Sequence, residues 1–243
     1  MKREYRIALA GNPNVGKSTI FNALTGMHQH TGNWPGKTVG SASGKYEYEG
    51  NSYIIYDLPG TYSLIAHSKE EEVARDFLCF EESDATVIVC DAVCLERNLN
   101  LVLQTIEINP NVIVCVNLLD EEKKKNIKID LKKLESILKV PVIGTTARSN
   151  KGLDKLLEKI KEVVTNQKVK FINQIRYDDC IETAISMVVP YLNKINTCNK
   201  RFIALQLLDD DTSIISSIHM HLGLKIMNED LERKVKEAKN YLS

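Results

Sequence analysis

The chain has 243 residues, 43% of them hydrophobic, which allows one large folded domain or a domain with a smaller companion. Lysine plus arginine and aspartate plus glutamate both total 32, so the formal net charge is zero. This balance excludes a bulk electrostatic attraction to nucleic acid or anionic lipid. The apolar runs are far below the roughly 18 residues of a membrane span, and the start MKREYRIALA is too short for a signal peptide, so a soluble protein is expected.

Short β-branched runs alternate with helix-like stretches up to about residue 165. The expected strands are 5–10, 52–57, 86–91, 111–117 and 141–145, and the expected helices are 17–26, 70–80, 95–108, 131–139 and 152–164. This order is typical of βα units on a mostly parallel α/β sheet that is covered on both faces. Residues 45–57 form two strand-like runs joined through 49–52, which predicts a hairpin and one antiparallel edge strand.

Helical periodicity with little strand character follows after about residue 170. The helical stretches are 177–195, 200–211, 213–222 and 228–242. They predict a small all-α domain behind the α/β domain. We place the domains at 1–166 and 167–243, with the junction in TNQKVKFINQ.

Six cysteines occur without CxxC pairs or the spacing of a disulfide framework. Several lie in apolar runs such as VIVCDAVC, so we interpret them as reduced, mostly buried thiols of a cytoplasmic protein, with a metal site as the alternative. The six are Cys79, Cys90, Cys94, Cys115, Cys180 and Cys198.

The stretch GNPNVGKST at residues 11–19 fits the phosphate-binding P-loop pattern, and it lies between an apolar strand and a helix start. Its two glycines let the backbone curl so that successive N–H groups point at a β-phosphate. Lys17 would bridge the β- and γ-phosphates, and the Ser18 hydroxyl would ligate Mg²⁺. The strand in front of the motif argues against a chance Gly-Lys-Ser.

A second motif, DLPG, ends the strand at 52–57. Asp57 would hold Mg²⁺ through a water, and the Gly60 N–H would sense the γ-phosphate. Between the two motifs, residues 30–44 are rich in glycine and small polar residues, which predicts a loop that orders around ligand. Thr38 is the preferred second Mg²⁺ ligand and γ-phosphate contact in this loop, with Thr31 as its competitor.

A third motif, NLLD, follows the strand at 111–117 and indicates which base is bound. The carboxylate of Asp120 can accept two hydrogen bonds from the N1–H and the exocyclic amine of guanine, which adenine cannot supply. Backbone N–H groups of Thr146, Ala147 and Arg148 would reach guanine O6. Asn117 and Asp120 form a weak motif alone, but in order with the P-loop and DLPG they indicate a GTP-binding domain.

The motifs GNPNVGKSTIFNALTG, GNWPGKTV, DLPGTYSL, DAVCLERNLNLVLQTIE and NLLDE together resemble the cytoplasmic N-terminal region of the bacterial ferrous-iron transporter B family. The resemblance covers residues 1–165, and GNWPGKTV and LERNL discriminate this family from other GTPases. It implies a Ras-like P-loop GTPase domain, followed by a helical domain that couples it to a polytopic membrane region importing Fe²⁺. The chain would then be the soluble portion on the cytoplasmic side of the bacterial inner membrane.

Two departures from other GTPases bear on the mechanism. Leu118 stands where many GTPases have a lysine that packs over the base, so weaker nucleotide affinity and faster GDP release are expected. Residues 61–63 after DLPG lack the glutamine that orients the attacking water in Ras-like proteins.

In related potassium-activated GTPases an asparagine at the position of Asn14 helps to bind K⁺, with carbonyl groups that would here come from Gly32 and Trp34. The alternative is that Asn14 only caps the loop.

The predicted site therefore uses GTP or GDP with Mg²⁺ and K⁺. The catalytic candidates are Asn14, Lys17, Thr38 and Gly60. Mg²⁺ would be held by Ser18, Thr38 and Asp57, and K⁺ by Asn14, Gly32 and Trp34. The nucleotide-binding candidates are Gly11, Asn12, Pro13, Asn14, Val15, Gly16, Lys17, Ser18, Thr19, Thr38, Asp57, Gly60, Asn117, Asp120, Thr146 and Ala147.

We interpret several other sequence features as structural or surface residues. The histidine pairs 28/30 and 219/221 are interpreted as surface or packing residues, since neither has a carboxylate or thiolate at useful spacing. The acidic runs 70–72 and 209–211 are interpreted as a solvated first helix turn and as a loop or cap. Trp34, the sole tryptophan, is expected to be a mobile lid, with a contact to the membrane region as the alternative.

Three functions stay open at the level of sequence. The first is the regulatory GTPase of a ferrous-iron transporter, whose partners are the membrane region and, as open alternatives, small cytosolic regulators and a second copy. The second is a soluble cation-activated GTPase of ribosome or RNA maturation, although no basic RNA-binding appendage is evident and no nucleic-acid partner is expected. The third is a module that binds GTP but hardly hydrolyses it. The sequence does not specify how the helical domain responds to the nucleotide, and the loop after DLPG and the LERNL helix are the places to look for a contact.

Overall fold

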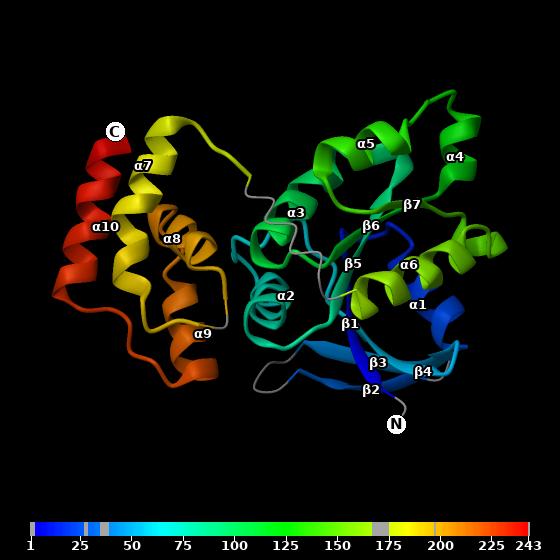
Figure 1. Ribbon diagram of the computed structural model, residues 1–243, viewed down its shortest axis with the longest axis horizontal. Coiled ribbons are helices and arrows are strands. Elements are labelled where there is room, and N and C mark those ends of the chain that lie inside the picture. Colours follow the sequence, from blue (N-terminus) through cyan, green and yellow to red (C-terminus); the bar gives the residue numbers. More distant parts are fainter. Residues whose placement is uncertain (1–2, 27–28, 35–38, 167–174, 197, 243) are drawn as a thin grey trace.

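The computed structural model describes residues 3–26, 29–34, 39–166, 175–196 and 198–242. His28, Thr38 and residues 167–174 of the predicted junction lie outside these described residues. Figure 1 shows an α/β part built around a twisted sheet and, beside it, a bundle of helices formed by the C-terminal residues. The predicted order, a P-loop-type α/β domain followed by an all-α domain, is confirmed.

The α/β part contains a seven-stranded sheet in the order β2-β3-β4-β1-β5-β6-β7. Strand β1 lies in the middle and pairs in parallel with both β4 and β5, and the sheet continues in parallel through β6 to β7. The mostly parallel sheet with antiparallel pairing at one edge agrees with the prediction. The strands are β1 (Glu4–Gly11), β2 (Gln29–Asn33), β3 (Gly40–Tyr48), β4 (Asn51–Asp57), β5 (Ala85–Asp91), β6 (Val112–Asn117) and β7 (Val142–Gly144).

The antiparallel edge is longer than the sequence indicates. The predicted hairpin is present, since β3 pairs antiparallel with β4, and Glu49 and Gly50 turn the chain with φ of 46° and 81°. Residues 30–33 and 40–44 were expected to be loop but lie in β2 and in the first half of β3, so that prediction is wrong for these residues. Their sequences have no apolar alternation, and backbone pairing of β2 with β3 and of β3 with β4 makes them strands.

Two layers of helices cover the sheet (Figure 1). One face packs against α2 (Lys69–Phe80), α3 (Leu95–Ile108) and α5 (Leu131–Leu138), and the other against α1 (Lys17–Thr25) and α6 (Leu153–Thr165). The central strands are buried on both sides, which explains why their sequences read as continuous apolar runs. The short helix α4 (Leu119–Lys124) and the 3₁₀ turns Ala92–Cys94 and Ala147–Ser149 connect elements at the carboxyl edge of the sheet.

The helical part has its own hydrophobic core of isoleucine, leucine, valine and alanine side chains. It consists of α7 (Asp179–Val188), the 3₁₀ turn Val189–Leu192, α8 (Lys200–Leu208), α9 (Ser213–Leu222) and α10 (Glu229–Leu242). Helix α9 lies beside α2 and α8 beside α3, so the bundle packs on one helical face of the α/β part (Figure 1). Among the described residues, none of the helices has the length and apolar character needed to cross a membrane.

Candidate functional site

The loop between β1 and α1 has the shape that its sequence predicts. Asn14 and Gly16 adopt left-handed backbone conformations, with φ of 66° and 85°, so the chain curls before it enters the helix. Gly16 is the N-cap of α1 and supplies no side-chain hydrogen bond to the first turn. The first N–H groups of a helix need partners, and here the cap leaves them for a ligand such as phosphate.

Lysine and aspartate from two motifs meet at this loop. The ammonium of Lys17 forms an ion pair with the carboxylate of Asp57 at the end of β4. Burial raises the pKa of Asp57, while the nearby Lys17 opposes that rise. The neighbouring Ser18 is exposed, so its hydroxyl is accessible beside the pair. Of the residues predicted for phosphate and Mg²⁺, the structure pairs Lys17 with Asp57, Ser18 follows Lys17 in the first turn of α1, and Thr38 lies outside the described residues.

The DLPG segment docks directly against the P-loop. Leu58 N donates to Leu9 O at 3.0 Å and Thr61 N donates to Gly11 O at 3.2 Å. Gly60 lies between these contacts, and a Cβ atom there would be 3.3 Å from Pro13 Cα. Only a residue without a side chain fits comfortably at this distance, which keeps the Gly60 backbone close to the phosphate-binding loop.

The side chain of Asn117 is hydrogen-bonded to other parts of the protein. Its Nδ2 donates to Val15 O at 3.1 Å, and its Oδ1 accepts from Thr145 Oγ1 at 3.1 Å and Ala147 N at 3.0 Å. A Cβ on Gly16 would lie 2.4 Å from Asn117 Nδ2, so the glycine is required for this approach. The buried amide thus joins the P-loop, the end of β6 and the loop after β7.

The predicted contacts to guanine O6 are modified by this arrangement. Ala147 N donates to Asn117, and Thr146 N donates to Lys151 O at 2.9 Å, so both amides shape the loop inside the protein. A hydrogen bond to guanine O6 stays a prediction for the next backbone N–H group, that of Arg148. Leu118, where other GTPases carry lysine, adopts a positive φ of 63° and turns the chain toward Asp120.

Two residues at this edge have buried polar atoms without a partner among the described residues. Asp120 has a buried Oδ1 without a hydrogen bond, and both Oδ1 and Nδ2 of Asn12 are in the same condition. Leaving such atoms unpaired costs free energy, so native proteins nearly always satisfy them. These atoms lie in the P-loop and in the base motif, where the sequence predicts a nucleotide. The remaining P-loop candidates divide into buried Gly11 and Val15 and exposed Pro13, Asn14 and Thr19.

The residues predicted to complete a K⁺ site lie in ordered structure. Gly32 pairs with Ser41 in the β2–β3 ladder, and Thr31 is exposed on the same edge strand. Trp34 N donates to Val39 O at 2.9 Å, and its indole packs edge-to-face on Phe77 of α2, with ring centroids 5.3 Å apart. In this structure Trp34 therefore contacts α2.

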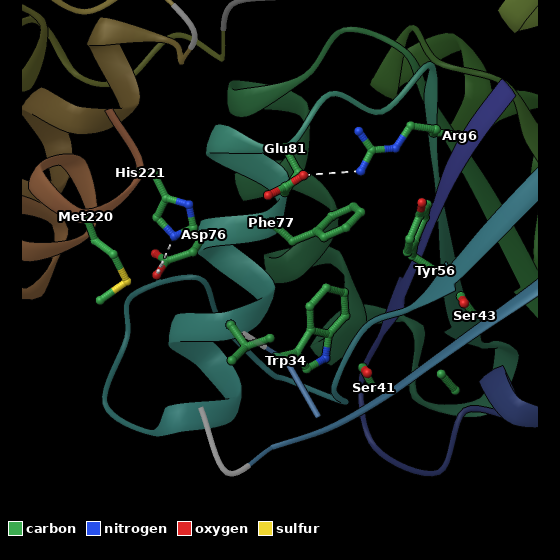
Figure 2. Close-up of a pocket in the computed structure, with 12 residues that line it drawn as sticks. Arg6, Trp34, Ser41, Ser43, Tyr56, Asp76, Phe77, Glu81, Met220 and His221 are labelled. Atoms are coloured by element: carbon green, nitrogen blue, oxygen red, sulfur yellow. Dashed lines mark hydrogen bonds and ion pairs between the residues drawn. The ribbon is translucent and has the colours of Figure 1, made fainter. Parts of the chain in front are cut away.

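A cavity of about 490 Å³ lies next to Trp34 (Figure 2). Figure 2 shows Tyr56 and Phe77 facing it from the α/β part and Met220 and His221 approaching from the helical part. Arg6 forms an ion pair with Glu81 at 3.1 Å at its border. The cavity is lined by no residue of the P-loop or the base motif, and of the predicted site only Trp34 borders it.

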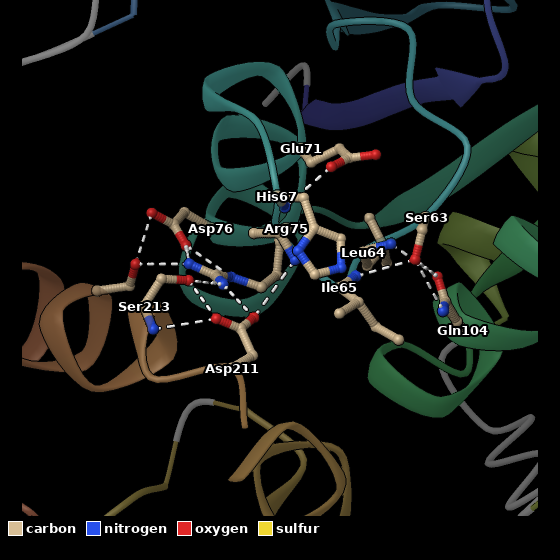
Figure 3. A network of polar contacts seen from close by, with 12 residues as sticks. Ser63, Leu64, Ile65, His67, Glu71, Arg75, Asp76, Gln104, Asp211 and Ser213 are labelled. Carbon is tan, nitrogen blue, oxygen red and sulfur yellow. Dashed lines mark hydrogen bonds and ion pairs between the residues drawn. The ribbon is translucent and has the colours of Figure 1, made fainter. Parts of the chain in front are cut away.

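A buried polar network between α2 and the helical part was missed by the sequence analysis (Figure 3). Arg75 is fully buried, and its guanidinium donates to Asp76 at 2.8 and 3.1 Å and to Asp211 at 2.8 Å. It also donates to Ser213 at 2.6 Å and Ser217 at 2.8 Å. All five N–H donors of the guanidinium are thereby used. The acidic run 209–211 offered the only sequence signal, because the buried partner of Asp211 is distant in the chain.

The segment after DLPG is held from two sides. Ala66 N donates to Asp211 at 3.3 Å, which connects this segment to the helical part. Gln104 of α3 accepts from Leu64 N at 2.7 Å (Figure 3), and Arg97 of the LERNL motif stacks over the Tyr62 ring at 4.1 Å. Asn199 Nδ2 donates to the backbone of α3 at Glu107 O, at 2.6 Å. The helical part therefore contacts both the segment after DLPG and the α3 helix that begins with LERNL.

The strand order, the P-loop between β1 and α1, and the DLPG and NLLD motifs at the carboxyl edge define a P-loop GTP-binding fold with an appended helical domain. A family model described as ferrous iron transport protein B matches residues 5–160, and one described as the FeoB cytosolic helical domain matches residues 177–243. The chain belongs to this FeoB family and comprises its G domain and its helical domain.

Relatives and solved structures agree with this assignment. The Fe(2+) transporter FeoB of Staphylococcus aureus (strain MSSA476) is 34% identical over 232 residues, which are 93% of this chain and 34% of that protein. A fusion of Fe(2+) transport protein A with FeoB from Porphyromonas gingivalis is 37% identical, over 85% of this chain and 25% of that protein. The chain thus spans about a third or less of these relatives. The crystal structure of the cytosolic domain of T. maritima FeoB in a GDP form has a TM-score of 0.83 at 36% identity and covers 99% of this chain and 98% of that one.

Proposed function

We propose that this chain binds GTP and hydrolyses it to GDP and phosphate. The observation that carries the proposal is the buried Oδ1 of Asp120, which has no hydrogen-bond partner among the described residues and lies at the same sheet edge as the uncapped P-loop helix. A guanine base supplies two N–H donors to such a carboxylate, and phosphate oxygens supply acceptors for the first turn of α1. The GDP-bound T. maritima relative supports the choice of a guanine nucleotide.

The chain offers a fitting set of oxygen ligands for Mg²⁺. Asp57 and the exposed hydroxyl of Ser18 flank the phosphate-binding loop, and Thr38 is proposed as the third contributor. Lys17, which now pairs with Asp57, would turn to the β- and γ-phosphates. Bound Mg²⁺ would neutralise phosphate charge as the γ-phosphate bond breaks. The positive charge of Mg²⁺ would favour the ionised carboxylate of Asp57, whereas burial alone raises its pKa and favours the neutral acid.

Potassium activation is the finer part of the proposal. Asn14 is exposed in the P-loop and has a left-handed backbone conformation, with φ of 66°. Its side-chain oxygen, together with carbonyl groups of Gly32 and Trp34, would hold K⁺ beside the β- and γ-phosphates. A cation in this position would offset developing charge, as an arginine does in systems where it contributes about 10³–10⁵ in rate. The Gly60 N–H would contact the γ-phosphate and a backbone-positioned water would attack.

The role in iron transport follows from the family. The relatives that match are Fe(2+) transporters about three times longer than this chain, so we propose that the domain gates or regulates Fe²⁺ uptake through a membrane region. The chain would act on the cytoplasmic side of the membrane. The fusion relative supports a small cytosolic regulator as a further partner, and self-association stays open. Nucleotide state would reach the helical domain through α2 and the segment after DLPG, which Asp211 contacts directly.

The deciding experiment measures GTP hydrolysis by the 243-residue chain in matched KCl and NaCl buffers, with ATP as the control nucleotide. We expect hydrolysis of GTP only, stimulated at least about tenfold by K⁺, and we expect the stimulation to vanish in Asn14→Ala. Asn150→Ala, another exposed asparagine with positive φ, is the matched control and should keep the stimulation. Equal GTPase rates in both salts would remove K⁺ from the proposal, and equal rates with ATP would remove the guanine assignment.

A further inference from the structure

Residues 61–65, which follow DLPG, form a segment that is held together by its own side chains. Thr61 Oγ1 donates to Ser63 O at 2.6 Å and accepts from Ser63 N at 3.2 Å, and Ser63 Oγ accepts from Ile65 N at 3.0 Å. Thr61 is 2% exposed, and the side chain of Leu64 is fully buried in the core between the sheet and its helices. Segment 61–65 is therefore a connected and anchored unit.

Segment 61–65 leads directly into the proposed phosphate site. The N–H of Thr61 donates to Gly11 O of the P-loop at 3.2 Å. The neighbouring Gly60 lies against Pro13, since a Cβ atom on Gly60 would be 3.3 Å from Pro13 Cα. A shift of the segment would therefore change the distance between Gly60 and the P-loop, where we propose that the γ-phosphate binds.

The side chain of Gln104 on α3 binds this segment with both atoms of its amide. Its Oε1 accepts from Leu64 N at 2.7 Å and from Ser63 Oγ at 3.3 Å, and its Nε2 donates to the same hydroxyl oxygen at 3.1 Å. Figure 3 shows the amide facing Ser63 and Leu64. The Leu64 N–H is the backbone donor of a buried residue, and leaving such a donor without a partner costs free energy. Loss of the Gln104 acceptor would therefore force segment 61–65 to shift toward water or another partner.

Two further side chains of α3 contact the segment from the same helix face. Asn100 Nδ2 donates to Tyr62 O at 3.3 Å, and Arg97 stacks over the Tyr62 ring at 4.1 Å. These positions precede Gln104 by four and seven residues, the spacing that aligns side chains along one face of a helix. Arg97 and Asn100 are exposed, whereas Gln104 is half-buried, so water competes least for the bonds of Gln104.

We infer that Gln104 is a positioning residue for GTP hydrolysis, which holds segment 61–65 so that Gly60 stays against the P-loop. The inference rests on the proposed function, in which the Gly60 N–H contacts the γ-phosphate. The hydrogen bonds that the Gln104 side chain makes to described residues go to this segment and not to the P-loop or the base motif. A donor held in place acts most strongly on the charge that develops in the transition state. Gln104 should therefore influence kcat rather than the affinity for the nucleotide.

The test compares kcat and KM for GTP, together with the affinity for GDP, in the 243-residue chain and in two Gln104 variants. Gln104→Met keeps the length of the side chain but makes no bond to Leu64 N, so kcat should fall about tenfold or more. KM and the affinity for GDP should change by less than about twofold, which also shows that the variant is folded. Gln104→Glu keeps an acceptor for Leu64 N and should retain kcat within about threefold of the parent chain. This rescue separates hydrogen bonding from packing.

Controls and an independent readout complete the experiment. Leu103→Met, at the neighbouring exposed position of α3, and Glu158→Gln, an exposed exchange on α6, are the matched controls and should keep the parent kcat. Amide hydrogen exchange reports on the segment without catalysis, and the Leu64 N–H should exchange faster in Gln104→Met than in the parent chain or in Gln104→Glu. Ser63→Ala removes the hydroxyl that both atoms of the Gln104 amide contact, and it should lower kcat about threefold at unchanged affinity for GDP.

The outcomes distinguish this inference from the proposed function. Unchanged or increased kcat in both Gln104→Met and Ser63→Ala would overturn the inference and leave the proposed GTPase function standing. Equal losses of kcat in Gln104→Met and Gln104→Glu would overturn it as well, because the acceptor would then not matter. A loss of GDP affinity as large as the loss of kcat would mean a general structural role and would also overturn it. A parent chain that hydrolyses no GTP would overturn the proposed function itself, and the inference with it.

Discussion

Two regions differ in how their buried polar groups are paired: the carboxyl edge of the sheet, where we propose that nucleotide binds, and the interface between α2 and the helical part. At the carboxyl edge of the sheet, Asn12 and Asp120 have buried atoms with no hydrogen-bond partner in the part of the chain that the structure describes. At the interface, the fully buried Arg75 uses every donor of its guanidinium on two carboxylates and two hydroxyls. Unsatisfied polar atoms mark a place that a ligand completes, whereas a closed network fixes one geometry. The first region therefore supports the proposed nucleotide site, and the second connects the α/β part to the helical part.

The largest expected effect tests the closed network. Arg75→Met removes the cation between Asp76 and Asp211 and leaves two buried carboxylates without compensation. We expect the free energy of unfolding to fall by about 3–5 kcal/mol, measured by urea denaturation. Arg233→Met, at an exposed arginine paired with Asp230, is the control and should change it by less than about 0.5 kcal/mol. A loss at Arg75 no greater than in the control would mean that the interface network contributes nothing.

The next largest effect concerns the P-loop lysine at the carboxyl edge of the sheet. Lys17→Ala removes the ammonium that we place on the β- and γ-phosphates, so kcat for GTP should fall by about 10²–10³. The unfolding free energy should change far less than in Arg75→Met, since Lys17 is paired only with Asp57 among the described contacts. Lys155→Ala, an exposed lysine on α6, is the control for kcat. Normal turnover by Lys17→Ala would show that this edge is not the catalytic centre.

The third effect, smaller than that of Lys17→Ala, is on the affinity for the guanine base. Asp120→Asn replaces two acceptor oxygens by one acceptor and one donor, so the affinity for GDP should drop about a hundredfold. Equilibrium titration with GDP and ADP provides the measurement, and the preference for GDP over ADP should shrink with it. Asp154→Asn, exposed in the first turn of α6, serves as the control. If the variant keeps its preference for GDP, the unpartnered Oδ1 has another role.

The smallest effect is a pH dependence on the interface side. Hydrogen bonds from Arg201 lower the pKa of Glu182 to about 2, from an ordinary 4.5. The folded pKa lies below the unfolded one, so this stabilisation is complete above about pH 4.5 and is lost as the pH falls toward 2. Glu182→Gln should therefore lower the melting temperature by a few degrees at pH 7, and the difference should narrow between pH 5 and pH 3. A constant difference across this range would contradict the assignment, and Glu158→Gln should show none.

The part of the carboxyl edge that the three motifs form could be predicted from the sequence, while the role of each residue toward a nucleotide stays a prediction. Its residues lie in short contiguous motifs, GNPNVGKST, DLPG and NLLD, and each motif ends a strand whose neighbours are set by the βα pattern. Parallel strands bring their carboxyl ends to one edge, so order in the chain implies proximity in space. The exceptions are Thr146 and Ala147, whose amides bond inside the protein because the Asn117 side chain reaches across from β6.

The strand β2 and the interface network could not be predicted in the same way. Residues 29–33 have no apolar alternation, and they become a strand only because β3 offers a ladder beside them. Arg75 and Asp211 are 136 residues apart, and nothing local in VARDF or DDD indicates that they meet. Trp34 likewise has a position that depends on Phe77 of α2, far along the chain.

The sequence by itself determined the class of fold, the phosphate loop and the base motif, because local backbone geometry and the order of βα units fix them. Only the tertiary structure decided which buried polar atoms are satisfied within the protein and which are left open. That distinction depends on side chains that come together from distant segments, as at Arg75 and Asp211, and on the absence of such partners for Asn12 Oδ1 and Asp120 Oδ1 among the described residues. Pairing across the fold is a property of packing, and packing has no signature in any single stretch of sequence.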